Sequence, residues 1–415
     1  MKTRFSTLTM MLAATVLASA LHAEVLTVGQ RMEHDNQPSK GLHVGGFYLS
    51  PRLTAGETYT DNVYAMPHNT KNDFITTVKP EVVAKSNWSR HSLNGLLNVE
   101  RSQYLDHNDE SHTNHTAAID GRLDVMKNTY VGGGVSTQYL HEDRGDPNAV
   151  AIASKPTAYR LNTAKVGVYR GLGRFNARVD SEVKNYNYDN GYTNTGALVN
   201  NGQRDRNEWT QSLRVGYKAT PGTEVFVRGD VDSRVYDHKG GAGTLNRSSH
   251  GNSVVAGVDM DISGKTKAEV FGGYMRRNFT DIGRKDITDP TYGAKVTWNP
   301  TGLTTVTGRV ARTIEETTLA SSSAYVNQSY DLGVEHGLTR NLLLTGGLGY
   351  ANNDYKGFAA NQRDDDIYSA NAGLKYYVNE WLAAGLGYSF INRESNVTGG
   401  DYTRNRIMAT LNGTY

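Results

Sequence analysis

The chain has 415 residues, with no cysteine, nine prolines, 44 glycines and 25 tyrosines, and apolar residues make up 37%. A globular chain of this length normally needs about 45–50% apolar residues, while the many Tyr, Val and Thr residues exclude disorder. The 44 Lys and Arg residues against 42 Asp and Glu leave no positive excess for binding nucleic acid. The absence of cysteine excludes disulfides, thiolate metal sites and a cysteine nucleophile.

Residues 1–23 have the pattern of a secretory signal peptide. Lys2 and Arg4 precede an apolar run, and small residues follow, so cleavage is expected after Ala20 or Ala23. The apolar run is shorter than the roughly 20 residues of a membrane helix. Cleavage removes two of the 44 positive side chains and no acid, so the mature chain is formally neutral, with 42 of each sign.

The dominant pattern in the rest of the chain has period two. In 175–184, Phe, Ala and Val alternate with charged and amide residues, and the same alternation recurs in 225–234, 253–262 and 404–415. Such alternation is typical of strands with one apolar and one polar face. Helical periodicity of comparable length does not occur, so the chain is predicted to be all-β.

The connections alternate between short turns and long polar loops. Eight turns and nine loops join 18 strands, with 16 as the alternative, and strands of roughly 10–14 residues can cross a bilayer when tilted by about 45°. The turns are expected at 86–90, 126–128, 170–173, 219–222, 263–265, 299–302, 336–340 and 378–380, and the loops at 61–72, 104–113, 143–156, 188–205, 238–251, 281–288, 318–322, 356–363 and 396–401.

Short turns, long loops, an even strand number and a polar inner face together favour an outer-membrane barrel over a soluble sandwich, whose two ends have no reason to differ. The sequence therefore predicts a transmembrane antiparallel up-and-down β-barrel with short periplasmic turns and long extracellular loops, in the outer membrane of a Gram-negative bacterium. The barrel is assigned to 44–415. The periplasmic N-terminal segment, 24–43, is too short for a separate plug domain.

Aromatic residues gather near the strand ends and predict interfacial girdles. Trp88, Trp298 and Trp381 lie at short turns, and the terminal Tyr415 fits the aromatic end that the barrel-assembly machinery recognises. The long-loop girdle is expected to contain six tyrosines: Tyr59, Tyr104, Tyr139, Tyr186, Tyr236 and Tyr350. Arg101 and Arg312 fall on the lipid-facing parity, where contact with lipopolysaccharide phosphates is a hypothesis.

The inward parity contains charges of both signs, which suits a weakly charged or neutral solute, although cross-strand ion pairs that only stabilise the wall explain them equally well. Inward Phe226, Phe271 and Tyr236 either stack on sugar rings or lie at the rim. The pore-lining candidates are Lys79, Glu81, Asp120, Arg122, Arg178, Asp180, Arg228, Asp230, Asp232, Arg234, Arg404 and Arg406.

No arrangement predicts an enzyme, a cofactor or a metal site. His141, beside two acidic residues at a strand end, is the least implausible catalytic residue. Four loop residues could in principle gather Zn²⁺, but solvated histidines are the simpler interpretation; they are His107, Asp109, His112 and His115. Residues 144–146 spell Arg-Gly-Asp, an adhesion tripeptide that loops also reach by chance.

Four motifs in the first third of the mature chain carry a family resemblance. They are a GxF-x-L-x-P strand at Gly46–Pro51, an E-x-Y-x-DN motif at Glu57–Asn62, a strand at Lys71–Pro80 and an S-x-W-x-R-H turn at Ser86–His91. The chain thus resembles the putative β-barrel porin 2 family. This resemblance implies a porin-like channel that serves as the exit for an exopolysaccharide or capsular polysaccharide.

Two other functions stay open: a general diffusion or solute-uptake porin, and a structural or adhesion barrel. The expected partners are outer-membrane lipid and lipopolysaccharide, the barrel-assembly machinery and, for polymer exit, periplasmic polysaccharide-export components. No nucleic acid is expected.

Overall fold

The computed structural model describes residues 25–37, 41–238, 246–357 and 362–415. The predicted signal peptide lies outside the described residues. Eighteen strands form the barrel: β2 (Phe47–Thr60), β3 (Asp73–Ser86), β4 (Ser92–Tyr104), β5 (His112–Met126), β6 (Thr129–His141), β7 (Ala158–Leu172), β8 (Phe175–Tyr188), β11 (Arg206–Thr220), β12 (Thr223–Tyr236), β13 (Ser249–Ile262), β14 (Thr266–Phe279), β15 (Ile287–Thr301), β16 (Thr304–Glu315), β17 (Ser322–Thr339), β18 (Leu342–Gly357), β19 (Asp364–Tyr377), β20 (Leu382–Ser395) and β21 (Tyr402–Thr414).

The other elements are short. They are helix α1 (Val28–Asn36), strand β1 (Leu42–Val44), the loop hairpin of β9 (Gly191–Tyr192) and β10 (Leu198–Val199), and two 3₁₀ turns, η1 (Asn108–Glu110) and η2 (Gly202–Arg204). Strand β1 pairs only with β2. No helix among the described residues is long and apolar enough to span a membrane.

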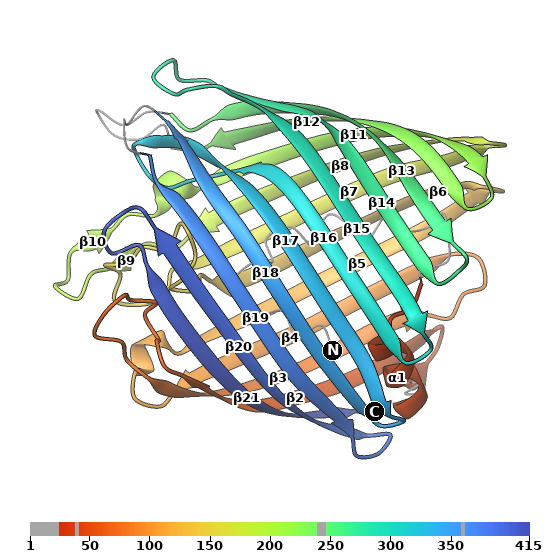
Figure 1. The fold of residues 1–415 in the computed structure, drawn as a ribbon, viewed down its shortest axis with the longest axis horizontal. Helices are drawn as coiled ribbons and strands as arrows, with labels where there is room; N and C mark the ends of the chain where they lie inside the picture. Colours follow the sequence, from red (N-terminus) through yellow and green to blue (C-terminus); the bar gives the residue numbers. More distant parts are fainter. Residues whose placement is uncertain (1–24, 38–40, 239–245, 358–361) are drawn as a thin grey trace.

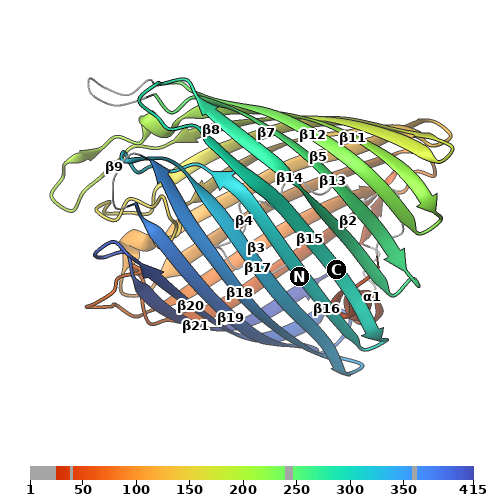
Figure 2. The same cartoon turned by 45° about the horizontal axis from the view of Figure 1, so that its top comes forward.

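The sheet closes on itself. Each strand is antiparallel to its neighbour along the chain, and the first barrel strand, β2, pairs with the last, β21, from Arg52 opposite Thr414 to Thr60 opposite Arg406. The closed, tilted strands are visible in Figures 1 and 2. Closure satisfies the backbone groups of every strand without a free edge, as a lipid environment requires. The predicted 18-stranded antiparallel barrel is confirmed.

The two faces of the wall differ as the alternation predicts. Leu97, Val135, Val254 and Leu348 are each about three-fifths exposed and belong to an apolar surface that runs around the barrel. Such a surface far exceeds the apolar patches that soluble monomers tolerate, so this face contacts lipid. Arg101 lies opposite Val78 on it and donates to the side chains of neighbouring polar residues.

The two ends of the barrel differ in their connections. The short turns lie together with α1 at one end, and the β9–β10 hairpin projects with the long loops at the other (Figure 1). Positive φ angles at Asn128, Gly173 and Ser263 allow the chain to reverse within a few residues at the short turns. Following the barrel architecture, the short turns are periplasmic and the long loops extracellular.

One stretch of the wall departs from a simple cylinder. Pairing between β15 and β16 ends at Gly293 opposite Ala311, although both strands continue toward the extracellular end, and Pro290 within this stretch has no N–H to donate. Beyond this point, Arg312 bridges the gap: its guanidinium lies 2.8 Å from Asp289. This ion pair engages Arg312, which was expected to face lipid.

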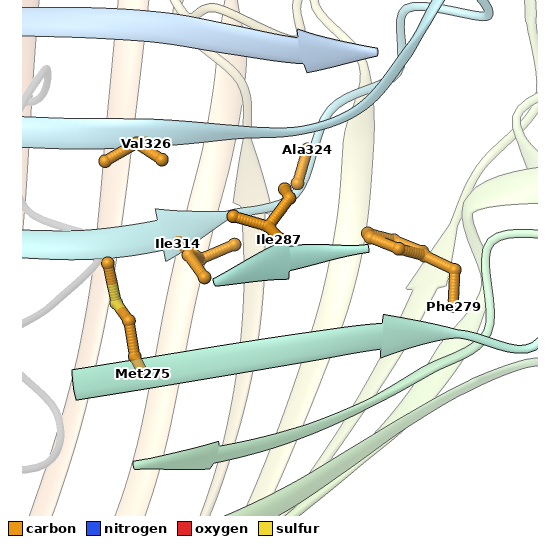
Figure 3. Close-up of a cluster of buried hydrophobic side chains, with 6 residues drawn as sticks. All are labelled: Met275, Phe279, Ile287, Ile314, Ala324 and Val326. Atoms are coloured by element: carbon orange, nitrogen blue, oxygen red, sulfur yellow. The ribbon is translucent and has the colours of Figure 1, made fainter. Parts of the chain in front are cut away.

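An apolar cluster shows how the strands continue past the gap. Met275, Phe279 and Ile287 come from the inner face of β14 and β15, whereas Ile314 and Val326 lie on the lipid-facing parity of β16 and β17, yet all are buried together (Figure 3). An inner face can contact an outer face only if the extracellular ends of β16 and β17 pass inside β14 and β15. The β16–β17 connection therefore folds into the lumen.

Candidate functional site: a constricted lumen

The loop between β6 and β7, residues 142–157, crosses the lumen; we call it the constriction loop. Asp143 accepts hydrogen bonds from Arg404 (2.9 Å) and Arg406 (3.1 Å) on β21, and Gly145 accepts one from Arg393 on β20. Strands β6 and β7 are far from β20 and β21 in the order of the ring. A single loop reaches all four strands only by passing through the interior.

The constriction loop is also bound to its own side of the barrel. Glu142 forms a buried ion pair with Arg204 of the β8–β11 loop. Arg144 binds Glu110 through two nitrogens, and both side chains are at most 8% exposed. Because breaking one side of a buried pair costs about 3–5 kcal/mol, these contacts hold the loop in place.

The inturned β16–β17 connection, residues 312–324, meets the constriction loop inside the barrel. The Asn148 amide donates to the Glu316 carbonyl at 3.1 Å and accepts from the Thr318 amide nitrogen at 2.9 Å. The Glu316 carboxylate pairs with Arg234 and accepts from the Tyr236 hydroxyl, 2.6 Å away on β12. Two segments from different parts of the ring thus narrow the extracellular half of the lumen together.

Burial and neighbouring charges together determine which carboxyl groups of the constriction are ionised. Burial alone would raise the pKa of Asp143, but the adjacent Arg404 and Arg406 lower it well below the usual range. Arg234 and Arg277 likewise overcome burial and lower the pKa of Glu316 to about 2. Burial, with Asp143 close by, instead raises the pKa of Asp146 well above its ordinary value. The constriction therefore contains two firmly ionised carboxylates beside one that is hard to ionise.

The periplasmic end of the lumen contains α1. Val28 and Met32 pack against Leu343, Tyr377 and Ala383, which occupy the inward parity of β18, β19 and β20. Each large apolar side chain buried in this way stabilises the docked helix by about 1.5–3 kcal/mol. The barrel wall thus holds the helix mainly by apolar contact.

Polar contacts fix both ends of α1. The Gly29 amide donates to the Glu335 carboxylate at 2.7 Å and the Val28 amide to the Thr305 hydroxyl at 2.8 Å, so two free N–H groups of the first turn are satisfied by the wall. At the other end, the Asn36 amide donates to a carbonyl of the short turn between β17 and β18.

Sequence reasoning missed this helix. The signal was a capping box: Thr27 accepts from the backbone of Gln30, and the Gln30 side chain accepts from the backbone of Thr27. A nine-residue helix is marginal alone, so its docking on the wall decides that it forms.

All twelve pore-lining candidates occupy positions that alternate with the lipid-facing residues, but the structure divides them into two groups. Asp232, Arg234, Arg404 and Arg406 belong to the constriction, where Arg277 pairs with Asp232. The other eight lie along the wall: Lys79, Glu81, Asp120, Arg122, Arg178, Asp180, Arg228 and Asp230. Passage of a solute along them stays a prediction.

The wall charges pair mainly along a strand rather than across strands. Arg178 lies 2.7 Å from Asp180 and Arg228 lies 3.1 Å from Asp230, in each case two residues along the same face; Arg122–Asp124 and Arg206–Glu208 repeat the arrangement. Lys79 with Glu100, on the next strand, is an example of the expected cross-strand type. Local pairs neutralise the wall without depending on the neighbouring strand.

Several aromatic residues lie elsewhere than expected. Tyr186 and Tyr236 are buried on the inner face, where Arg206 lies 3.9 Å and 5.8 Å from their ring centres, so they do not belong to a girdle. Arg214 lies 3.7 Å above the Phe226 ring and Arg228 lies 4.9 Å above Phe271. Phe226 and Tyr236 are also nearly fully buried, so they are not exposed to stack on sugars. Arg228 covers one face of Phe271, and stacking of a sugar on Phe271 stays a prediction.

The aromatic residues at the short turns are about half exposed. Trp88 contacts Phe47, and Trp381 stacks on the terminal Tyr415 with ring centres 5.3 Å apart. Trp298 lies near the periplasmic end of β15 on the lipid-facing parity. Their function as an interfacial girdle stays a prediction.

Two of the histidines considered for chemistry lie together, because the ring centres of His112 and His141 are 4.8 Å apart. His107 contacts Asp73, the His112 imidazole contacts the Glu110 carbonyl, and His115 stacks on Tyr139. Within the described ranges, no group of three or more His, Cys, Asp or Glu residues is arranged to hold a metal ion. His141 binds Asn114.

Part of the constriction was missed, although four of the predicted pore-lining residues belong to it. Asp143, Glu316, Asn148 and Arg393 come from loops and strand ends where sequence shows only polar character. In the Arg-Gly-Asp string at 144–146, Gly145 is buried and the Arg144 side chain is paired to Glu110 and 8% exposed, so the string is unsuited to adhesion.

The middle of one sector of the inner wall is uncharged, although the arginines of the constriction lie on the same face toward the extracellular end and Lys375 toward the periplasmic end. On β18–β21, Thr345, Asn371 and Thr410 lie flat over glycines of the neighbouring strand: a Cβ at Gly373 would meet Thr345 at 2.6 Å, and one at Gly385 would meet Thr410 at 2.5 Å. Glycine therefore makes room for the polar side chains to lie against the wall, which makes this part of the wall hydrophilic.

Known proteins resemble the chain at different levels. The outer membrane protein OpdK of Pseudomonas aeruginosa has a TM-score of 0.46 and 10% identity over 88% of this chain and 99% of that one. OccK2 (OpdF) of the same organism has a TM-score of 0.47 and 10% identity over 88% of this chain and 98% of that one. The ferric citrate transporter FecA has a TM-score of 0.46 and 11% identity over 84% of this chain and 60% of that one. No curated protein matches the sequence. The family profile described as Putative beta-barrel porin 2 matches residues 37–415.

Proposed function

Because the chain belongs to the Putative beta-barrel porin 2 family and is a porin-like channel of the Gram-negative outer membrane, we propose that it passes small hydrophilic solutes by diffusion or uptake. An 18-stranded barrel leaves an aqueous lumen. The observation that carries the proposal is the constriction loop, which crosses the lumen to β21 through Asp143 and meets the inturned connection through Asn148. A lumen narrowed in this way selects solutes by size.

The lining supports solutes that are neutral or weakly charged. Locally paired wall charges give no dominant sign, and the sector over β18–β21 offers hydroxyl and amide groups that can replace part of the hydration shell of a polar solute. Binding of this kind is weak and repeated, which suits passage.

Liposome swelling tests the proposal. Purified protein reconstituted into liposomes should admit small sugars and amino acids, with rates that fall steeply with solute size, and shortening the constriction loop should extend the range to larger sugars. Swelling no faster than in protein-free liposomes, for every solute, would contradict the proposal.

Exit of an exopolysaccharide is our second candidate function. The uncharged middle of the β18–β21 wall favours it, because hydroxyl groups, amide groups and glycines dominate the surface that a sliding polymer would meet there. A polymer requires both the constriction loop and α1 to move aside, however, because each occupies part of the lumen. Deleting the gene and measuring surface polysaccharide decides this candidate, and unchanged export would rule it out.

A further inference from the structure

The contact between the constriction loop and β21 has the geometry of a bound carboxylate. Oδ1 of Asp143 accepts from Arg404 at 2.9 Å and from the Gly145 amide at 2.7 Å, and Oδ2 accepts from Arg406 at 3.1 Å. Two arginines two residues apart on one strand face present their guanidinium groups side by side. Paired guanidinium groups are a preferred arrangement for recognising carboxylates.

The arginines offer more donors than Asp143 uses. Arg404 is 1% exposed, yet its Nε and Nη2, together with Nε of Arg406, have no hydrogen-bond acceptor in the described part of the chain. Leaving a buried donor unsatisfied costs about 1–3 kcal/mol each. A ligand with additional oxygens next to its carboxylate would satisfy them.

The surrounding charges favour an anion once Asp143 leaves. Arg393 is bound through the Gly145 carbonyl, which belongs to the same loop, and Tyr402 lies beneath both Arg393 and Arg404. The nearby Glu142 is neutralised by Arg204, and Asp146 forms part of the loop itself, accepting from the Asp143 amide. Withdrawal of the loop would therefore leave three arginines facing the lumen.

We propose that Arg404 and Arg406 form a binding site for the carboxylate of an acidic sugar, that Asp143 occupies this site in the closed channel, and that the sugar acid displaces it. The constriction loop then loses its attachment to β20 and β21, and the lumen widens. This inference deepens the proposed function, because it names a solute class and a control at the same constriction.

The competition sets the concentration at which the sugar acid acts. A side chain on a short tether has an effective concentration in the millimolar range. A free carboxylate must reach comparable concentrations or gain contacts that Asp143 lacks, and the unsatisfied nitrogens of Arg404 and Arg406 provide such contacts. The site is therefore suited to a carboxylate flanked by ring or hydroxyl oxygens.

Titration calorimetry on the purified full-length protein tests the site, with galacturonate as the probe and galactose as the matched neutral sugar. Galacturonate should bind and galactose should not. In Asp143→Asn the internal competitor is weakened, so galacturonate should bind about tenfold more tightly if the loop occupies the site about nine-tenths of the time. Asp237→Asn, an exposed aspartate that accepts a hydrogen bond from Asn207 and lies outside the constriction loop, is the control and should bind like the wild type.

A second variant removes the proposed site itself and not its internal competitor. Arg404→Gln combined with Arg406→Gln should abolish galacturonate binding, with folding checked by heat-modifiable migration on gels; should this variant fail to fold, the Asp143→Asn comparison decides alone. Equal affinity in Asp143→Asn and the wild type, or equal binding of galactose, would overturn the inference.

Calorimetry does not depend on transport, so the two proposals can fail separately. Binding as described without liposome swelling would refute the diffusion function and leave the site standing. Swelling with no galacturonate binding would refute the site and leave the diffusion function standing.

Discussion

The two ends of the lumen are narrowed by segments of the same chain that are held in opposite ways. At the extracellular end, the constriction loop and the inturned connection are bound through ion pairs centred on Asp143 and Glu316. At the periplasmic end, α1 is held by Val28 and Met32 against an apolar part of the wall. The first closure depends on charge and can be displaced by ions, whereas the second depends on burial and should be insensitive to them.

The largest effect is expected from Glu316→Ala. This variant removes the closer of the two carboxylates that pair with Arg234 and leaves the Tyr236 hydroxyl without its acceptor, at a cost of about 3–5 kcal/mol to the closed arrangement. The inturned connection should detach, and single-channel conductance in planar bilayers should rise severalfold. Glu316→Gln keeps an acceptor for the Tyr236 hydroxyl, so its conductance should lie between those of the wild type and Glu316→Ala. Wild-type conductance in Glu316→Ala would mean that this ion pair does not hold the connection.

Met32→Ala tests the other end. Truncating a buried methionine costs about 2–5 kcal/mol, which should release α1 and make the bond after Arg31 accessible to trypsin. His34→Ala is the matched control, since His34 lies on the exposed side of the same helix. Release of α1 should be unaffected by 1 M salt, which screens the charges of the constriction. Strong salt dependence of cleavage would contradict the apolar description.

Asp146 predicts a pH dependence confined to the extracellular end. Its pKa is raised in the closed loop, so the closed state binds the proton more tightly than the open state. The stabilisation that protonated Asp146 gives the closed state is complete below the ordinary aspartate pKa of about 3.9. It is lost as the pH rises through the raised pKa of the closed state. Open probability should therefore rise with pH in the wild type, and Asp146→Asn should flatten that rise. Identical profiles for both proteins would rule Asp146 out.

The smallest effect is expected from Glu335→Gln. This variant keeps a hydrogen-bond acceptor for the Gly29 amide but removes the negative charge from the helix N-terminus, which is worth about 0.3–1 kcal/mol. Tryptic cleavage at Arg31 should increase slightly, and less than in Met32→Ala. An effect as large as that of Met32→Ala would show that charge also dominates at the periplasmic end.

The barrel was predictable because its physics is local. Period-two alternation and the order of turns and loops indicate the number of strands, the closure of the sheet and its two faces. Val179 and Arg178, for example, are neighbours in the chain, and the alternation alone places the first on the lipid side and the second on the lumen side. The capping box of α1, formed by Thr27 and Gln30, is equally local, so the helix could have been predicted from the sequence. Its docking site could not, because Leu343 and Tyr377 lie more than 300 residues further along the chain.

The sequence alone determined a membrane barrel of 18 strands, with a polar inner face and nearly balanced charge, because each strand must satisfy the same alternation against lipid. Only the tertiary structure decided which charges meet. Asp143 and Arg404 are 261 residues apart and become partners because the closed ring brings β21 within reach of a loop that crosses it. Closure and overlap of the wall are long-range events, and they convert a generic polar lumen into a constriction with a defined ion pair.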